Sequence, residues 1–92
     1  MDALTSGTDN IAMGKNALGT YTTGVGNIAL GTLAAGGANV TGNCNFVVGH
    51  TAGENLTTGS DNIFLGYKAG TSNLSNNNIF TTLIKKVYNS LL

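Results

Sequence analysis

The chain repeats a short pattern in which an asparagine precedes alternating apolar residues and a glycine ends the run. Successive copies begin 17, 18, 17 and 16 residues apart. The copies are Asn10–Gly14, Asn27–Gly31, Asn45–Gly49, Asn62–Gly66 and the incomplete Asn78–Phe80. Self-similarity at a fixed period predicts stacked repeats, each of which buries its apolar side only against its neighbours.

A second pattern, rich in threonine and ending in glycine, keeps the same phase. Its copies are Leu4–Gly7, Tyr21–Gly24, the shortened Val40–Gly42, Leu56–Gly59 and the degraded Leu74–Ser75. We expect these residues at the far edge of each repeat, opposite the strand. The irregular stretches 36–39 and 73–77 are where the repeat length varies, so we expect them on the surface.

The residues after each asparagine alternate as a strand does, and they divide between two faces. Both faces are apolar, which is typical of a strand that is buried on both sides. We assign one stripe to the interior, and the other stripe then needs a cover. The stripe assigned to the interior is Ile11, Met13, Ile28, Leu30, Phe46, Val48, Ile63, Leu65 and Ile79. The opposite stripe is Ala12, Ala29, Val47, Phe64 and Phe80.

The residues around each strand suit a coil with tight corners. Glycine ends four of the strands, where a positive φ or a close backbone approach is needed. Three residues after each glycine comes an alanine that we expect inside the next edge: Ala17, Ala34, Ala52 and Ala69. The repeated asparagines predict a column whose side-chain amides hydrogen-bond along the stack, although asparagine is also common in turns. This column is Asn10, Asn27, Asn45, Asn62 and Asn78.

The C-terminal segment differs in kind from the repeats. Glycine is absent from residues 82–92, and apolar residues recur there at helical spacing with Lys85 and Lys86 on the other side. The pattern predicts a short helix that caps the last coil, since a bare strand edge is a template for another chain. A short helical bundle between chains is the second interpretation. The predicted domains are therefore a repeat domain at 1–81 and a helical cap at 82–92.

Composition excludes several classes of function. The chain has four basic and four acidic residues and no net charge, so it lacks the basic cluster that nucleic acid requires. No apolar run approaches the ~20 residues of a membrane-spanning helix, and we expect no membrane insertion. A single cysteine cannot form a disulfide within the chain. The N-terminus lacks the basic and apolar segments of a signal peptide, so we expect that this chain does not direct its own export.

The corners also fit the hexapeptide signature of left-handed β-helix acyltransferases, in which His50 could act as general base. Only one edge of each coil matches that signature, and Lys15, Thr32 and Tyr67 replace His50 in the other copies. One cysteine and one histidine cannot supply a transition-metal site, and two aspartates that precede the asparagines fit turns better than calcium sites. We therefore expect no catalytic residue, no cofactor and no metal.

The repeats resemble those of a known class of fibrous proteins. The pattern Asn-Ile-Ala-Leu-Gly-x-x-Ala at 27–34, and with Met13 for Leu at 10–17, resembles the head repeats of trimeric autotransporter adhesins. The pattern Thr-Thr-Gly-x-x-Asn, at 22–27 and 57–62, is similar to repeats in phage tail fibres and bacterial surface proteins. The resemblance covers residues 4–80. It implies a left-handed parallel β-roll with three chains side by side, on fibres that touch host cells.

In that arrangement the stripe Ala12, Ala29, Val47, Phe64 and Phe80 is the subunit interface. We therefore expect an all-β parallel β-roll or β-solenoid of four to five coils with a short C-terminal helix, assembled as a homotrimer. Its expected function is that of a non-enzymatic structural and adhesive module of an extracellular or virion fibre. Its partners are itself and a cell-surface receptor or glycan, contacted through the exposed variable positions Lys15, His50, Tyr67 and Lys68.

Two alternatives come from other classes. The first is a solenoid subunit that stacks end to end into a filament and binds no receptor. The second is a hexapeptide-repeat protein similar to the left-handed β-helix acyltransferases.

Overall fold

The computed structural model describes residues 7–19, 22–37, 39–71 and 76–81. These residues form five strands and no helix: β1 (Ile11–Met13), β2 (Ile28–Leu30), β3 (Phe46–Val48), β4 (Ile63–Leu65) and β5 (Ile79–Thr81). Each strand directly follows one of the repeated asparagines, as the alternation predicts. The predicted helical cap at 82–92, and with it the second domain, lies outside the described residues.

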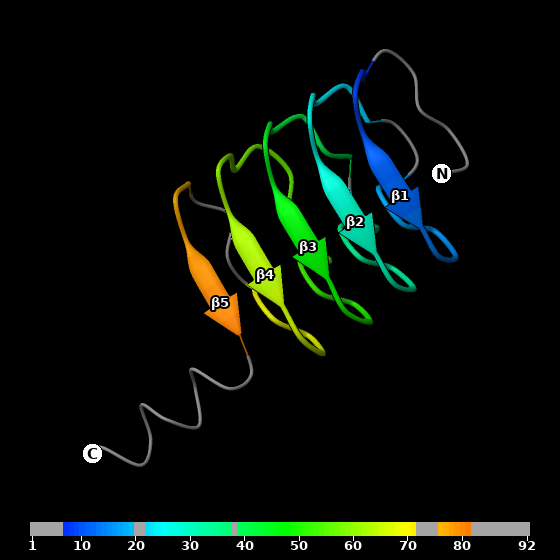
Figure 1. Ribbon diagram of the computed structural model, residues 1–92, viewed down its shortest axis with the longest axis vertical. Helices are drawn as coiled ribbons and strands as arrows, with labels where there is room; N and C mark the ends of the chain where they lie inside the picture. Colours follow the sequence, from blue (N-terminus) through cyan, green and yellow to red (C-terminus); the bar gives the residue numbers. More distant parts are fainter. Residues whose placement is uncertain (1–6, 20–21, 38, 72–75, 82–92) are drawn as a thin grey trace.

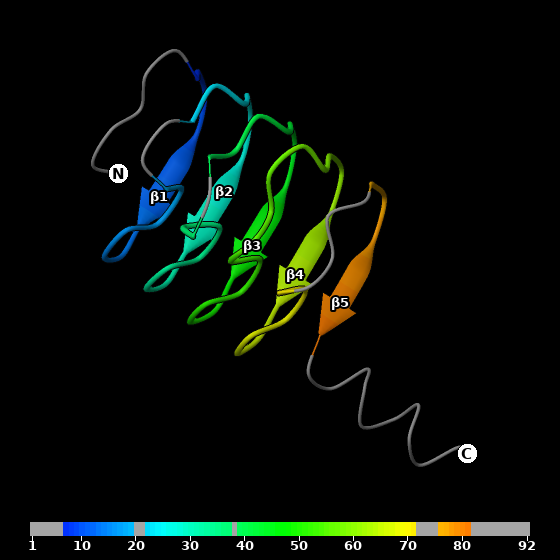
Figure 2. The same ribbon diagram turned by 180° about the vertical axis from the view of Figure 1, so that it is seen from behind.

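The five strands form one parallel sheet in sequence order. Equivalent positions of consecutive repeats pair with each other, so that Ile11 is opposite Ile28 and Ile28 is opposite Phe46. A tight corner follows β1 to β4, and a return segment then carries the chain back to the start of the next strand (Figure 1). Seen from behind, the return segments lie on the same side of the sheet (Figure 2).

Hydrogen bonds between consecutive repeats continue outside the strands. In the corners, the amide nitrogen of Leu18 lies 2.9 Å from the carbonyl oxygen of Ala34, and that of Ala35 lies 2.8 Å from the oxygen of Ala52. In the return segments, Thr41 N donates to Thr57 O over 2.8 Å. Backbone groups thus find partners in the neighbouring repeat even where the chain turns, as buried backbone requires.

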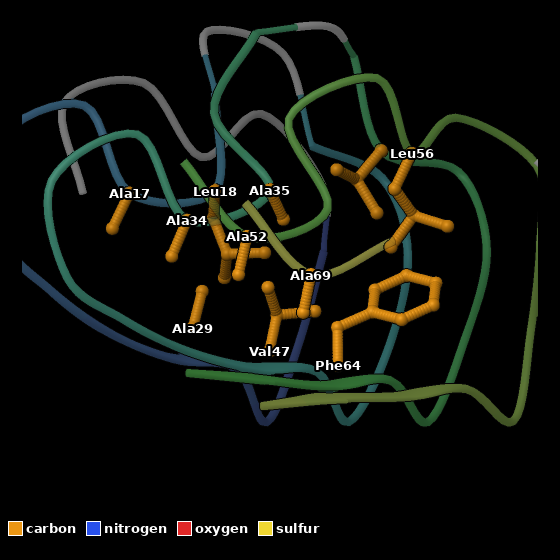
Figure 3. Close-up of a cluster of buried hydrophobic side chains, with 11 residues drawn as sticks. Ala17, Leu18, Ala29, Ala34, Ala35, Val47, Ala52, Leu56, Phe64 and Ala69 are labelled. Carbon is orange, nitrogen blue, oxygen red and sulfur yellow. The ribbon is translucent and has the colours of Figure 1, made fainter. Parts of the chain in front are cut away.

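The core is a narrow space between the sheet and the return segments. Figure 3 shows its side chains pointing into this space from both sides. The strands contribute Ala29, Val47 and Phe64, and the other walls contribute Ala17, Leu18, Ala34, Ala35, Val40, Ala52, Leu56 and Ala69. The alanines that follow the corner glycines are therefore inside, as predicted.

The sizes of facing core residues change in opposite directions along the stack. The strand position grows from Ala29 to Val47 to Phe64, while the corner position four residues after each strand-ending glycine shrinks from Leu18 and Ala35 to Gly53 and Gly70. A Cβ atom added to Gly70 would lie 2.4 Å from the Phe64 ring, and one added to Gly53 would lie 2.9 Å from it. Each corner thus leaves the volume that its strand residue fills.

The assignment of the two stripes is wrong and must be exchanged. Ala29, Val47 and Phe64 are at most 1% exposed within a single chain, so they form the core and cannot be a subunit interface. Ala12 packs against the same core, and Phe80 pairs with Phe64 in the sheet register. The larger residues face outward, with Met13 67% and Ile79 61% exposed. The physical reason is the width of the interior, because the corners that face the strands contribute mainly alanine and glycine, and so narrow a space cannot hold the larger stripe.

Two phenylalanines one strand apart test this exchange. Replacing the buried Phe64 with alanine should lower the free energy of unfolding by about 3–5 kcal/mol, because it leaves a cavity. Replacing Phe46, which is 38% exposed on the outer face, should cost only about 1–2 kcal/mol. Urea unfolding at two protein concentrations measures the loss of unfolding free energy in each variant. The loss for the Phe64 variant should not change with protein concentration. Equal losses for the two variants would contradict the placement of the core.

Candidate functional site

The five repeated asparagines form a continuous hydrogen-bonded ladder along the stack. The Oδ1 atom of each one accepts from the backbone N–H of the next, at 2.7 Å from Asn10 to Asn27, 2.9 Å to Asn45, 3.1 Å to Asn62 and 2.9 Å to Asn78. The same Oδ1 atoms of Asn27, Asn45 and Asn62 also accept from the side-chain Nδ2 of the next asparagine. The predicted asparagine ladder is therefore confirmed.

The ladder also explains why the threonine-glycine pattern keeps its phase. The Nδ2 atoms of Asn10, Asn27 and Asn45 donate to the carbonyl oxygens of Gly24, Gly42 and Gly59 in the next repeat, at 2.8–2.9 Å. Asn45 thereby uses both amide hydrogens and both lone pairs of its oxygen.

The glycines in this contact leave no room for a side chain. A Cβ atom on Gly24 would lie 2.0 Å from the carbonyl oxygen of Gly42, and one on Gly42 would lie 1.9 Å from that of Gly59. The asparagine and the glycine are thus two halves of one contact between repeats.

The residue before each ladder asparagine adopts a left-handed backbone conformation. The φ angles of Asp9, Gly26, Cys44, Asp61 and Asn77 lie between 58° and 72°. Glycine, asparagine and aspartate tolerate this conformation best. The two aspartates therefore have a conformational role, in agreement with their interpretation as turn residues. Cys44, which is exposed, is the residue least suited to its position.

A second, exposed ladder lies two residues before the ladder asparagines. The backbone N–H of Val25 donates to Asn43 Oδ1, that of Asn43 to Ser60 Oγ, and that of Ser60 to Asn76 Oδ1, over 2.7–2.9 Å. This ladder was not predicted from the sequence. Its signal was a hydrogen-bonding side chain two residues before the ladder asparagine in three successive repeats.

The side of the sheet that points away from the core carries two columns of apolar side chains. We call this surface the outer face. One column is Ile11, Ile28, Phe46, Ile63 and Ile79, and the other is Met13, Leu30 and Val48 with Leu65. Six of these nine side chains are between 38% and 67% exposed: Ile11, Met13, Phe46, Ile63, Leu65 and Ile79. Soluble monomers rarely leave a contiguous apolar surface of this kind without a function.

The predicted receptor positions lie at the corners that follow the strands. The His50 and Tyr67 rings are 5.7 Å apart, and the Lys68 Nζ atom lies 5.4 Å from the centroid of the Tyr67 ring. Lys15 lies two repeats before His50, with Thr32 at the equivalent position between them. All four predicted residues are exposed. The structure brings His50, Tyr67 and Lys68 together and leaves Lys15 apart.

Among the residues with a described position, no group of three or more His, Cys, Asp or Glu side chains could hold a metal ion. That part of the chain also contains no helix long and apolar enough to cross a membrane. Comparison of the chain with protein-family models, curated proteins and solved structures gave no match.

The ladder predicts that replacing a buried ladder asparagine costs much more stability than replacing an exposed asparagine. Replacing Asn45 with leucine should lower the free energy of unfolding by about 1–3 kcal/mol, because Gly59 O and Asn62 N lose their partners. The exposed Asn39 is the matched control, and its replacement by leucine should change stability by less than about 0.5 kcal/mol. Chemical denaturation of both variants makes the comparison, and equal losses would show that the ladder contributes nothing specific.

The backbone conformation at Cys44 predicts that some substitutions there increase the stability of the fold. Replacing Cys44 with asparagine or glycine should raise the free energy of unfolding by about 0.5–1 kcal/mol, since both residues tolerate a positive φ better than cysteine. Replacement by alanine removes the same thiol without relieving the backbone and serves as the control. Thermal unfolding under reducing conditions compares the three variants. An alanine variant as stable as the asparagine variant would rule out the conformational explanation.

Proposed function

We propose that the chain is a non-enzymatic structural module, a β-solenoid of four to five coils that assembles side by side with copies of itself as a homotrimer in a fibre. The observation that carries the proposal is the outer face, an apolar surface that runs the length of the sheet. Burying a half-exposed aliphatic or aromatic side chain is worth roughly 1 kcal/mol. The six most exposed residues thus supply a substantial driving force for association.

The solenoid part of the proposal is supported by the hydrogen bonds that join consecutive repeats. These bonds occur at the ladder, in the corners and in the return segments, as well as between the strands. Each of these parts of a repeat is therefore hydrogen-bonded to the same part of the next repeat. A chain built in this way is a stiff rod whose stability comes from contacts between neighbours.

A second copy of the chain matches the outer face well, because its side chains recur along the stack at the same distance. Strands in a sheet lie ~4.8 Å apart, so the outer-face side chains recur at that distance along the stack. A partner can fill the gaps between them in all five repeats only if its own side chains recur at the same distance. Another copy meets this condition by construction, and the resemblance to trimeric fibre heads agrees with three copies around one axis.

Receptor contact through Lys15, His50, Tyr67 and Lys68 stays a prediction. Its support is their exposure and their variation between repeats whose scaffold positions are constant. The proposed localisation, on a cell surface or in a virion fibre, follows from the same resemblance.

Light scattering of the purified chain tests the assembly. We expect three times the chain mass of 9.3 kDa. Replacing Met13 and Leu65 with glutamate should yield a folded monomer, because each charge would have to be buried in the interface. Replacing the exposed Asn39 and Thr58 with glutamate is the matched control and should leave the mass unchanged. A monomeric unmutated chain would refute the proposal, and an open-ended polymer would favour the end-to-end filament.

A further inference from the structure

Charged residues flank the outer face on two opposite sides. Asp9 and Asp61 lie just before β1 and β4, while Lys15 and Lys68 lie in the corners just after the same two strands. These four residues are exposed and are four of the five charged residues that the structure describes. The edge where the strands start is therefore acidic, and the edge where they end is basic.

The two signs of charge also occur in the same repeats. The first and fourth repeats each have an aspartate at one edge and a lysine at the other. In place of the aspartates, the second repeat has Gly26 and the third has Cys44. Lys68 lies one residue further into its corner than Lys15 does, and the second and third repeats have Thr32 and His50 at the position of Lys15 and Leu33 and Thr51 at that of Lys68. Within one repeat an extended segment of six or seven residues separates aspartate from lysine by roughly 15–20 Å. The strand thus keeps the two charges of one chain apart.

We infer that neighbouring copies meet through their outer faces with their stacks pointing in the same direction and equal repeats at equal height. This inference rests on the proposed self-assembly. An axis parallel to the stack brings the strand-start edge of one copy to the strand-end edge of its neighbour. Asp9 then meets Lys15 of the neighbouring copy, and Asp61 meets Lys68 of that copy.

The opposite arrangement matches none of these charges. If the stacks pointed in opposite directions, strand-start edges would meet each other, with the first repeat facing the fifth and the fourth facing the second. Asp9 would then face Asn77, and Asp61 would face Gly26. Charge complementarity across an interface selects orientation and register, and here it selects the parallel arrangement. Lys15 and Lys68 are thereby reassigned from receptor contact to the boundary between copies.

Charge-reversal variants test the pairing. Replacing Asp9 and Asp61 with lysine makes both edges basic, and replacing Lys15 and Lys68 with aspartate makes both edges acidic. Each double variant should associate at least about tenfold more weakly than the unmutated chain, because like charges then meet. The fourfold variant, in which all the charges are exchanged, should regain the original association. Replacing Asp9 and Asp61 with asparagine suits the left-handed backbone there and checks that a loss of association is not a loss of folding.

Mixing the two double variants reports the symmetry of the assembly. In a two-fold assembly every junction of a mixed pair joins unlike charges, so the mixture should associate fully. In a three-fold ring one junction must always join like charges, so the mixture should recover only in part. Unchanged association of both double variants would overturn the pairing and leave the proposed function intact, provided that the Met13 and Leu65 variant dissociates. A monomeric unmutated chain would overturn both.

Cross-linking tests the direction of the stacks. In the parallel arrangement Cys44 of one copy lies at the height of position 50 of the next, so His50→Cys should be joined to it by a bismaleimide that spans the ~10 Å between packed sheets. Covalent dimers or closed trimers are expected for that variant, and the unmutated chain should stay uncross-linked. In the antiparallel arrangement Cys44 of two copies would meet, because the third repeat is the middle one. Cross-linking of the unmutated chain would therefore overturn the inference.

Discussion

The fold depends on one buried polar contact that recurs in every repeat. A primary amide has two donors and two acceptor sites, and a buried Asn45 uses all four on the repeats above and below it. Leaving such groups unpaired costs more than a single bond contributes, so each repeat is stable only when its neighbours are in register. The ladder thereby connects the start of each strand to the glycine of the next return segment, and the two sequence patterns must keep a common phase.

This contact also limits what the interior can hold. The strand starts and the return segments come close together at the ladder, where a Cβ on Gly24 would lie 2.8 Å from Asn27 Nδ2. Six of the eleven core residues are alanine, and Phe64 fits because Gly53 and Gly70 make room for it. The larger apolar side chains must then lie on the outer face. The proposed assembly follows from the same restriction, because a chain with so narrow a core cannot bury both apolar stripes of its strands.

Much of this architecture was predictable from the sequence, and one part was predicted the wrong way round. The period, the strands, the glycine corners with φ near 120° and the asparagine ladder all follow from residues that are recognisable one at a time. The direction of the two stripes is not recognisable in this way, because both are apolar and alternation does not say which face is inside. A comparison between positions would have found it, since the opposite size changes at Val47, Phe64, Gly53 and Gly70 show which residues share a space.

The candidate interaction surfaces were predicted to different degrees. Exposure of His50, Tyr67 and Lys68 follows from their variation between repeats, and the repeat pattern predicted them at corresponding corners of successive coils. The opposite charge of the two sheet edges was not predicted, because it becomes visible only when Asp9 and Asp61 are seen at one edge and Lys15 and Lys68 at the other. The exposed ladder through Asn43 and Ser60 was also missed, since exposed asparagine and serine are common in turns.

Hydrogen exchange of asparagine side-chain amides, followed by nuclear magnetic resonance, tests the ladder most directly. The side-chain NH2 groups of Asn27, Asn45 and Asn62 are buried and bonded to neighbouring repeats, whereas Asn16 and Asn39 are exposed. We expect the three ladder amides to exchange orders of magnitude more slowly than the two exposed ones, with protection that approaches that of the strand backbone. Equally fast exchange of all five side chains would show that the ladder does not hold the repeats together.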